Sequence, residues 1–483
     1  MEDQRQKTKS RFRVLLLIAT FFLLFLLLSG GRAEAASGKW KKTAGGRRYV
    51  YVDGTYAKSR WIKVNDKYYY LNARGYMLTG WRTIGGKRYY LNDNGVRQTG
   101  WKTISEKRYY FGKNGVMRTG WQNISGKRYY FGKNGVMRTG WKTIDGKKYY
   151  FNTKGVLARD EMLGDRYVNQ DGAWTFTYQK PDYEVMDYFK KPLCRVVSEL
   201  NALGSDWDSF VVASDFHGNW DRQHSQAVIR YLLENSSAKK CFLLGDYNLF
   251  SYKYSASKYF EQYTKSLLPV KDQIYATIGN HDRQSGNEYD KSYMKVVYDT
   301  FLADKDYLKG DPEDYYFYFD IPKKKLRYLV LSTSNHPESQ RRMTEEELEW
   351  LQQDALVLPG EDWTVMAMGH IDMDPDITIR YKGKHKDAPL VAHLLANCNG
   401  NVAGYISGHQ HQDYQSYVKD SFYQTVVNCD FYQEGMEGRS VGNETEQTVT
   451  VVSVNTKTGE VRFQRIGPSC GDLIKDYNYY AGE

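Results

Sequence analysis

A 20-residue repeat in the first third of the chain constrains its fold more than any other feature. Tryptophans recur at this period, at Trp61, Trp81, Trp101, Trp121 and Trp141, and Trp40 starts an imperfect earlier copy. Each copy holds two short aromatic runs that flank a two-residue turn, such as Gly85-Gly86. Residues of this kind accept the positive φ that a tight hairpin turn requires. One hairpin cannot bury its own aromatic side chains but a stack can, so we predict a β-hairpin solenoid over residues 37–174.

The charge is divided unevenly between this module and the rest of the chain. The whole chain carries +11, but residues 39–159 hold 28 Lys and Arg against 5 Asp and Glu, a net charge of +23. Residues 160–483 hold 34 against 49, a net charge of −15, and the first 38 residues add +3. Such asymmetry indicates an anionic partner for the basic module.

The N-terminus has the pattern of a signal peptide over residues 1–36. Five basic residues precede the apolar run 14–28, and Ala33-Glu34-Ala35 follows as a cleavage pattern. The alternative is an uncleaved anchor, and under either interpretation the remainder is exported. After cleavage we expect no stable membrane span. The five widely spaced cysteines lack CxxC spacing, which argues against a disulfide framework or a zinc ribbon.

Five short motifs in the second half each follow an apolar run. We predict buried strands over 210–214, 241–244, 274–278, 363–368 and 402–407. The motifs that follow them are Asp215-Phe216-His217, Gly245-Asp246, Gly279-Asn280-His281-Asp282, Gly369-His370 and Gly408-His409-Gln410-His411. An α/β scaffold gathers such residues into one pocket at the carboxyl edge of its sheet. A mixture of Asp, Asn and His suits a borderline divalent metal better than calcium or an iron–sulfur cluster.

The order of these motifs resembles the calcineurin-like metallophosphoesterase family over roughly residues 205–465. The resemblance implies a four-layer αββα sandwich and two divalent ions, Mn, Fe or Zn. It implies that one ion is held by Asp215, His217, Asp246 and His411, and the other by Asp246, Asn280, His370 and His409. It further implies that a hydroxide activated by both ions attacks phosphorus, and that Asn280 helps to stabilise the added charge. By the same resemblance His281 protonates the leaving oxygen, and we expect Asp282 to orient its imidazole.

The rest of the second half carries no further catalytic motif. We expect residues 175–204 to form a linker leading into the phosphoesterase domain, that domain to cover 205–470, and a tail to follow over 471–483. The strands predicted at 447–454 and 460–465 are expected to end the second sheet. Four histidines match no motif and are expected to be structural, namely His224, His336, His385 and His393.

The repeats resemble the cell-wall-binding repeats of Gram-positive surface proteins, a group that includes choline-binding and glucan-binding modules. Where choline-binding members usually place a Trp before the Tyr-Tyr pair, this chain has a cation, at Arg88, Arg108, Arg128 and Lys148. A guanidinium there removes one wall of the aromatic cage and repels a quaternary ammonium. We therefore expect a wall polyanion such as a teichoic acid, or a glycan, and disfavour choline. The alternative is that the aromatics only fill the solenoid core and the cations are a solvated face.

Together these features predict an exported, wall-associated, metal-dependent phosphoesterase at the surface of a Gram-positive-type bacterium. Its substrate is expected to be a phosphate mono- or diester. One alternative from another class is a surface adhesin whose enzyme domain is vestigial. A second alternative is a secreted metal-dependent nuclease whose basic repeats hold nucleic acid, which we favour less.

Overall fold

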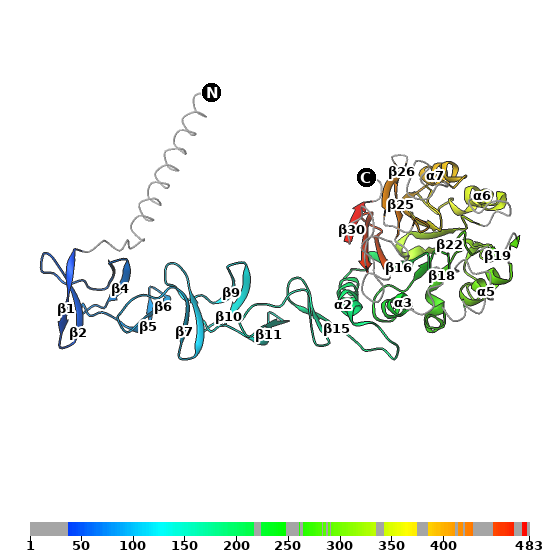
Figure 1. The fold of residues 1–483 in the computed structure, drawn as a ribbon. Coiled ribbons are helices and arrows are strands. Elements are labelled where there is room, and N and C mark those ends of the chain that lie inside the picture. Colours follow the sequence, from blue (N-terminus) through cyan, green and yellow to red (C-terminus); the bar gives the residue numbers. More distant parts are fainter. Residues whose placement is uncertain are drawn as a thin grey trace, which may run out of the picture. The chain divides into compact units, whose positions relative to one another are not determined.

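The structure is a computed structural model of the 483-residue chain. It describes residues 37–216, 224–247, 260, 264–282, 284–285, 288–289, 291–334, 342–373, 385–410, 414–418, 421–427, 448–467 and 476–480. The chain divides into two compact units, Met1–Arg159 and Asp160–Glu483 (Figure 1). The predicted signal segment lies outside the described residues. In the described part, no helix is both long and apolar enough to cross a membrane.

The first unit is the predicted series of antiparallel hairpins. Its paired strands are β1 (Gly38–Thr43) with β2 (Gly46–Tyr51), β3 (Arg60–Val64) with β4 (Lys67–Leu71), β5 (Gly80–Ile84) with β6 (Lys87–Leu91), β7 (Gly100–Ile104) with β8 (Lys107–Phe111), β9 (Gly120–Ile124) with β10 (Lys127–Phe131), and β11 (Gly140–Ile144) with β12 (Lys147–Phe151). The predicted two-residue turns are present: Gly85 and Gly86 have φ of 55° and 74°. These angles match the right-handed twist of the strands they join.

Contacts between consecutive repeats hold the hairpins together. The ring of Trp81 meets Tyr90 of its own hairpin at 5.2 Å and Tyr109 of the next at 4.9 Å, both edge to face. The residue after each Tyr-Tyr pair, a leucine or a phenylalanine, is fully buried, as at Leu91, Phe111 and Phe131. Aromatic burial across repeat boundaries is therefore what stabilises the stack, as the sequence predicted.

The second unit begins with the truncated last repeat. Strands β13 (Glu161–Leu163), β14 (Arg166–Val168) and β15 (Trp174–Thr177) form a three-stranded sheet that packs against helix α2 (Asp187–Asn201). Tyr167 and Val168 are fully buried there. The contacts thus group this sheet with the second unit, and α2 lies inside the stretch predicted as a linker. The domain boundaries themselves stay predictions.

A six-stranded sheet carries the first three motifs. Its order is β18 (Ile274–Ala276), β17 (Cys241–Leu243), β16 (Trp207–Ala213), β28 (Val449–Asn455), β29 (Glu460–Ile466) and β30 (Asp476–Tyr480). β16, β17 and β18 are parallel, whereas β28 runs antiparallel to β16. The expectation that β28 and β29 end the second sheet is therefore wrong, because the chain returns to the first.

A seven-stranded sheet carries the last two motifs. Its order is β21 (Lys309–Asp311), β22 (Tyr316–Ile321), β23 (Leu326–Leu331), β24 (Thr364–Gly369), β25 (Asn401–Ser407), β27 (Phe422–Val426) and β26 (Tyr414–Val418). β23, β24, β25 and β27 are parallel to one another. β24 and β25 therefore end at the same edge.

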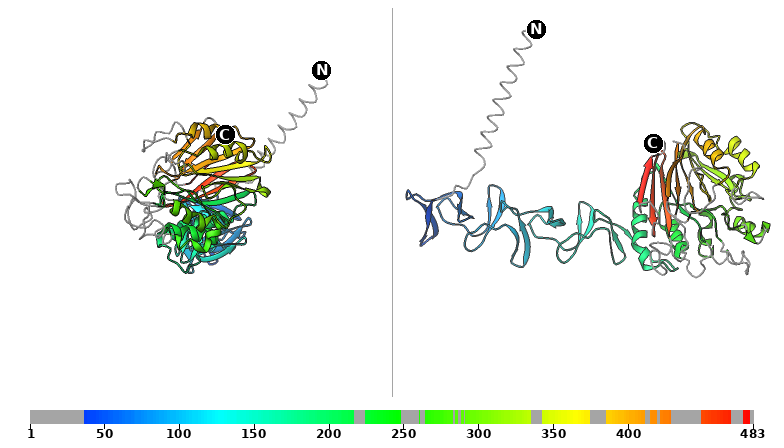
Figure 2. Two further views of the ribbon diagram at one scale, coloured as in Figure 1. Left: turned by 90° about the vertical axis from the view of Figure 1, so that its right-hand side faces the viewer. Right: turned by 45° about the horizontal axis from the view of Figure 1, so that its top comes forward.

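The two sheets pack face to face between helices, which confirms the predicted four-layer sandwich (Figure 2). One core cluster joins both sheets with α2 and α3 (His224–Asn235), and a second lies between the seven-stranded sheet and α6 (Glu345–Trp350) and α7 (Ala388–Ala396). The remaining short elements are α5 (Lys291–Phe301), β19 (Gln284–Ser285), β20 (Glu288–Tyr289), η1 (Leu268–Gln273), η2 (Pro322–Lys324) and η3 (Leu351–Ala355).

Candidate metal centre

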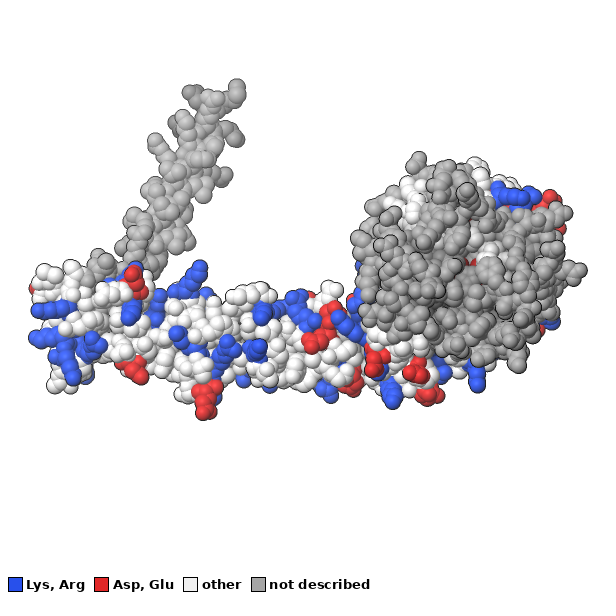
Figure 3. All heavy atoms as spheres, viewed as in Figure 1, with Lys and Arg blue, Asp and Glu red and all other residues white. Residues whose placement is uncertain are grey.

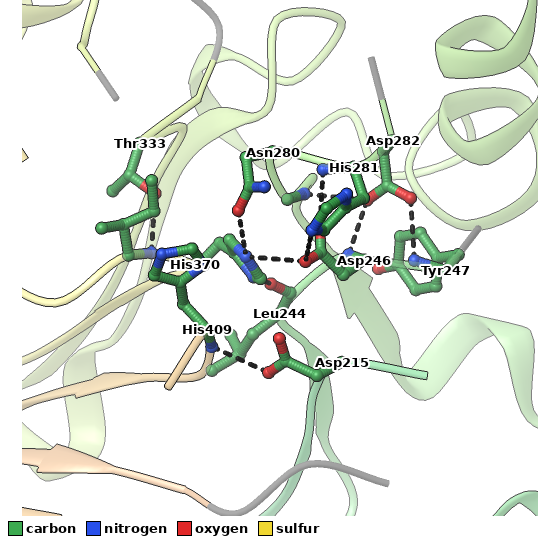
Figure 4. Close-up of polar contacts among 12 residues, drawn as sticks. Asp215, Leu244, Asp246, Tyr247, Asn280, His281, Asp282, Thr333, His370 and His409 are labelled. Carbon is green, nitrogen blue, oxygen red and sulfur yellow. Dashed lines mark hydrogen bonds and ion pairs between the residues drawn. The ribbon is translucent and has the colours of Figure 1, made fainter. Parts of the chain in front are cut away.

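The carboxyl ends of five strands from both sheets bring the predicted site residues together (Figure 4). Asp215 and Asp246 follow β16 and β17, and Asn280, His281 and Asp282 follow β18. His370 follows β24 and His409 follows β25. His217 and His411 lie outside the described residues, so their predicted ligand roles stay predictions.

The glycines of the motifs allow the loops to approach closely. Gly245 has a φ of 95°, and a Cβ added there would lie 2.2 Å from the amide nitrogen of Gly279. A Cβ at Gly408 would lie 1.9 Å from Ser214 Oγ. Neither position has room for a side chain. The residues next to these glycines, Asp246 and His409, have positive φ of 56° and 67°, as does Asp215 at 56°. Left-handed backbone at non-glycine residues is costly and gathers at functional sites.

Three buried side chains form a cluster with the geometry of a metal site. One ligand atom each from Asp246, His370 and His409 lies within 4.8 Å of the other two. Asp246 and His370 are fully buried, and His409 is 6% exposed. A carboxylate and two imidazoles this deep in the protein need a compensating cation or proton.

His370 shows why a cation fits here. Its Nδ1 lies 2.8 Å from the carbonyl oxygen of Leu244, which can only accept a hydrogen bond, so Nδ1 carries a proton. Its Nε2 lies 3.1 Å from Asn280 Oδ1 and 3.2 Å from Asp246 Oδ2. If the ring of His370 is neutral, its Nε2, Asn280 Oδ1 and Asp246 Oδ2 are all acceptors, and no proton lies between them. Burial lowers the pKa of His370, but Asp246 and the other nearby carboxylates outweigh burial and raise it to about 9. A divalent metal would replace that proton.

The two oxygens of Asp246 have different surroundings. Oδ1 accepts a hydrogen bond of 2.8 Å from the backbone N–H of His281. Oδ2 faces His370, and His281 Nε2 lies 4.0 Å from it. The carboxylate is thus fixed by the third motif while its other oxygen points at the imidazoles.

Asp282 holds the loops that follow β17 and β18 together. Its carboxylate accepts hydrogen bonds of 2.7 to 2.8 Å from the backbone N–H groups of Asp246, Tyr247 and Gly279. Burial and the charge of Asp246 raise the pKa of Asp282 to about 7. Both carboxylate oxygens of Asp282 accept hydrogen bonds from backbone amides next to Asp246, and the expected orientation of His281 by Asp282 stays a prediction.

Asp215 connects the two sheets. Its Oδ2 accepts a 2.8 Å hydrogen bond from the backbone N–H of His409, a residue 194 positions away in the sequence. The first and the last motifs are thereby fixed to each other.

Several residues that are not predicted ligands support the site. The side chain of Gln410 donates a 2.7 Å hydrogen bond from Nε2 to Asp372 Oδ1, and both residues are 1% exposed. Thr333 Oγ1 accepts from the backbone N–H of Ile371 at 2.9 Å, next to His370. Gln410 stands inside the last motif and Asp372 lies two residues after His370, whereas nothing in the sequence signalled Thr333.

His385 is structural, as its lack of a motif suggested. It is 2% exposed, its Nε2 donates to the carbonyl oxygen of Thr333 at 3.0 Å, and its Nδ1 accepts from the N–H of Asp387 at 3.2 Å. Both ring nitrogens are thus hydrogen-bonded when the ring is neutral. Burial lowers the pKa of His385 to about 4.

Comparison with known proteins assigns both parts of the chain. Residues 209–413 match the family model for the calcineurin-like phosphoesterase. Residues 57–97, 98–139 and 118–160 match that for the choline-binding repeat. A calcineurin-like phosphoesterase domain preceded by choline-binding repeats is therefore present, which confirms the resemblances. The second match stands against the expectation that choline is disfavoured.

Similar solved structures include choline-binding proteins. Choline-binding protein F from Streptococcus pneumoniae is 38% identical over 29% of this chain and 48% of its own, with a TM-score of 0.28. The protein CbpJ from the same organism is 34% identical with the same coverage and TM-score. The pneumococcal cell wall endolysin from phage Cp-1, complexed with choline, is 30% identical over 31% and 41%, with a TM-score of 0.21. The match thus covers about half or less of the length of each of these proteins. A search of curated proteins found no match.

Proposed function

We propose that this chain, a calcineurin-like phosphoesterase domain behind choline-binding repeats, is an exported, cell-wall-associated phosphoesterase that hydrolyses phosphate mono- or diesters with two divalent metal ions. The observation that carries the proposal is the buried cluster of Asp246, His370 and His409, in which acceptor atoms converge on one point. Such a cluster costs folding free energy unless a cation occupies it.

The residues that would hold the ions follow from the five motifs. Asp215, Asp246, Asn280, His370 and His409 lie at the site, and His217 and His411 complete the proposed set. Two divalent ions, Mn, Fe or Zn, would supply the Lewis acidity that activates water and neutralises charge on a phosphoryl group. The ligand set does not select one metal, because these metals share N and O ligands.

The protein side chains have further roles in this reaction. His281 is the proposed proton donor to the leaving oxygen, since its side chain is 22% exposed and borders Asp246. Asn280 directs its Oδ1 to His370, and Asp282 holds the loop that carries Asn280 and His281. The rigid loop would keep the proton donor at a fixed place relative to the phosphoryl group.

The repeats are the proposed wall anchor. Choline-binding repeats are typical of proteins associated with the Gram-positive cell wall, and residues 39–159 add a net charge of +23. The proposed ligand is a wall polyanion or a glycan. Choline remains a candidate because of the family match.

Hydrolysis by the full chain tests the proposal. The protein is loaded with Mn, Fe or Zn and assayed with p-nitrophenyl phosphate, bis(p-nitrophenyl) phosphate and phenyl phosphate. We expect Asp246→Asn to abolish metal binding and hydrolysis. His281→Ala should lower kcat by about 10²-fold or more, and more for phenyl than for p-nitrophenyl esters, because the poorer leaving group needs the proton. His393→Ala, exposed on α7, is the control.

The alternatives give different results. A chain that binds wall but hydrolyses none of the three esters with any of the metals would be an adhesin with a vestigial domain. Cleavage of DNA that falls steeply with salt and requires residues 39–159 would instead identify a nuclease.

A further inference from the structure

Three arginines in the repeats place their guanidinium groups over tryptophan rings. The guanidinium carbon of Arg88 lies 4.6 Å from the ring centroid of Trp81. The equivalent distances are 4.3 Å for Arg108 over Trp101 and 4.4 Å for Arg128 over Trp121. The three pairs occupy the same position in successive 20-residue repeats, so one arrangement recurs three times along the module.

The backbone of each arginine is fixed by the next repeat. The carbonyl oxygen of Arg88 accepts a hydrogen bond from Met117 N–H, and that of Arg108 from Met137 N–H, both at 2.8 Å. Arg128 accepts likewise from Leu157 at 2.9 Å. Each tryptophan is fixed too, since Trp101 and Trp121 meet tyrosines of the following repeat at 4.9 Å. The guanidinium groups therefore sit on a rigid surface with their side-chain entropy already reduced.

The charge of these groups is left uncompensated by the module. Within residues 37–159, all of which the structure describes, no carboxylate pairs with Arg88, Arg108 or Arg128. Arg88 and Arg108 are exposed and Arg128 is partly exposed. Figure 3 shows Lys and Arg side chains along the visible face of the repeats with few Asp and Glu.

We propose that the guanidinium groups of Arg88, Arg108 and Arg128, each held over a tryptophan, form a repeated set of phosphate-binding sites for a linear polymer with phosphodiester links. A guanidinium held over an indole ring has fewer conformations to lose on binding, and its planar N–H edge matches two oxygens of a phosphate. Evenly repeated sites suit a ligand with regularly repeated phosphates, because each further contact is intramolecular. The proposal rests on the wall association proposed above and assigns its ligand class and residues.

Binding of poly(glycerol phosphate) to the full chain tests this proposal. The assay is run in EDTA, so that hydrolysis does not occur and failure of the phosphoesterase proposal stays a separate result. The variant Arg88→Gln/Arg108→Gln/Arg128→Gln should weaken binding at least about tenfold. The matched control is Lys87→Gln/Lys107→Gln/Lys127→Gln, which removes the same charge from the adjacent, exposed position of the same strands. It should weaken binding by less than about threefold.

A third variant separates stacking from charge. Arg88→Lys/Arg108→Lys/Arg128→Lys keeps the charge but removes the planar donor edge, so it should bind nearly as weakly as the glutamine variant. Equal losses in the arginine and lysine triples, or full binding by this third variant, would overturn the proposal in favour of unspecific attraction. Absence of polymer binding, or equally tight binding of uncharged dextran, would overturn it as well.

Discussion

Gln410 lies between two histidines of the last motif, and its side chain is tied to the loop of another strand. Its hydrogen bond to Asp372 joins the segment after β25 to the segment after β24. His370 and His409 are thereby set relative to each other by two residues that are not proposed ligands. Partners of this kind orient metal ligands and are often needed for full affinity.

We therefore expect Gln410→Ala to weaken metal binding by about 10- to 100-fold. Competition between the protein and a chelator of known affinity measures this effect without reference to activity. Gln353→Ala, at an exposed position of η3, should leave the metal affinity unchanged. An affinity in Gln410→Ala equal to that of the wild type would show that the hydrogen bond has no positioning role.

His385 should make the fold sensitive to acid. Its pKa is about 4 in the folded protein against 6.5 for an unperturbed histidine, because burial disfavours the charged ring. Between these values the unfolded chain binds a proton that the folded chain excludes. The contribution of neutral His385 to the free energy of unfolding is therefore fully present above about pH 6.5 and is lost as the pH falls toward 4.

The test compares melting temperatures at pH 7.5 and pH 5.0 in EDTA, which removes the effect of metal release. His385→Gln should melt at a lower temperature than the wild type at pH 7.5, yet show a smaller difference between the two pH values. His393→Gln, an exposed substitution, serves as the control. An undiminished difference in His385→Gln would contradict the assignment.

At the scale of elements, the site depends on how closely the strand ends approach. The loop after β17 touches the loop after β18 at Gly245, and the loop after β25 touches the end of β16 at Gly408. Each contact joins elements that carry different proposed ligands. A side chain at either glycine would separate those ligands as well as strain the fold.

Gly408→Ala should therefore destabilise the domain by more than about 2 kcal/mol and weaken metal binding together. The added Cβ would lie 1.9 Å from Ser214 Oγ and 2.3 Å from Asp215 Oδ2, so Asp215 must move. Gly204→Ala is the matched control, since its Cβ would meet nothing within 4 Å. Denaturant unfolding and metal titration measure the two effects, and a variant with normal values in both would refute the close-approach argument.

At the scale of the whole molecule, the last partial repeat belongs structurally with the enzyme unit. Its buried Tyr167 and Val168 pack with α2, and Lys191 of α2 forms a 3.0 Å ion pair with Asp160. The repeat thus supplies part of the second unit's packing.

A fragment that starts at residue 160 should accordingly be more stable than one that starts at residue 178. Removal of the β13–β15 sheet exposes apolar surface of α2, which costs roughly 25 cal/mol per Å². Thermal unfolding of the two fragments measures the difference. A fragment starting at residue 140 is the control and should gain little beyond the first. Equal melting temperatures for the fragments from 160 and 178 would show that the sheet adds nothing.

Local chemistry made much of this protein predictable. The hairpins follow from the period of the tryptophans and from the turn residues, both of which are local signals within about twenty positions. Their two-residue turns have the expected positive φ. The five strands before the motifs were predicted to within a few residues, because continuous apolar runs are a local signal. β22 and β23 were not predicted as strands, although residues 316–319 and 328–331 are continuous apolar runs, because no metal-binding motif follows them to draw attention to these runs.

The sequence alone determined the repeat, the strands and the residue types that suit a metal. Only the tertiary structure decided that β28 and β29 return to the first sheet, that Asp282 binds backbone amides, and that Gln410 binds Asp372. Each of these depends on contacts between segments far apart in the chain, as Asp215 and His409 show at 194 positions. Such pairings follow from how two sheets pack, and packing is a property of the whole core rather than of any local pattern.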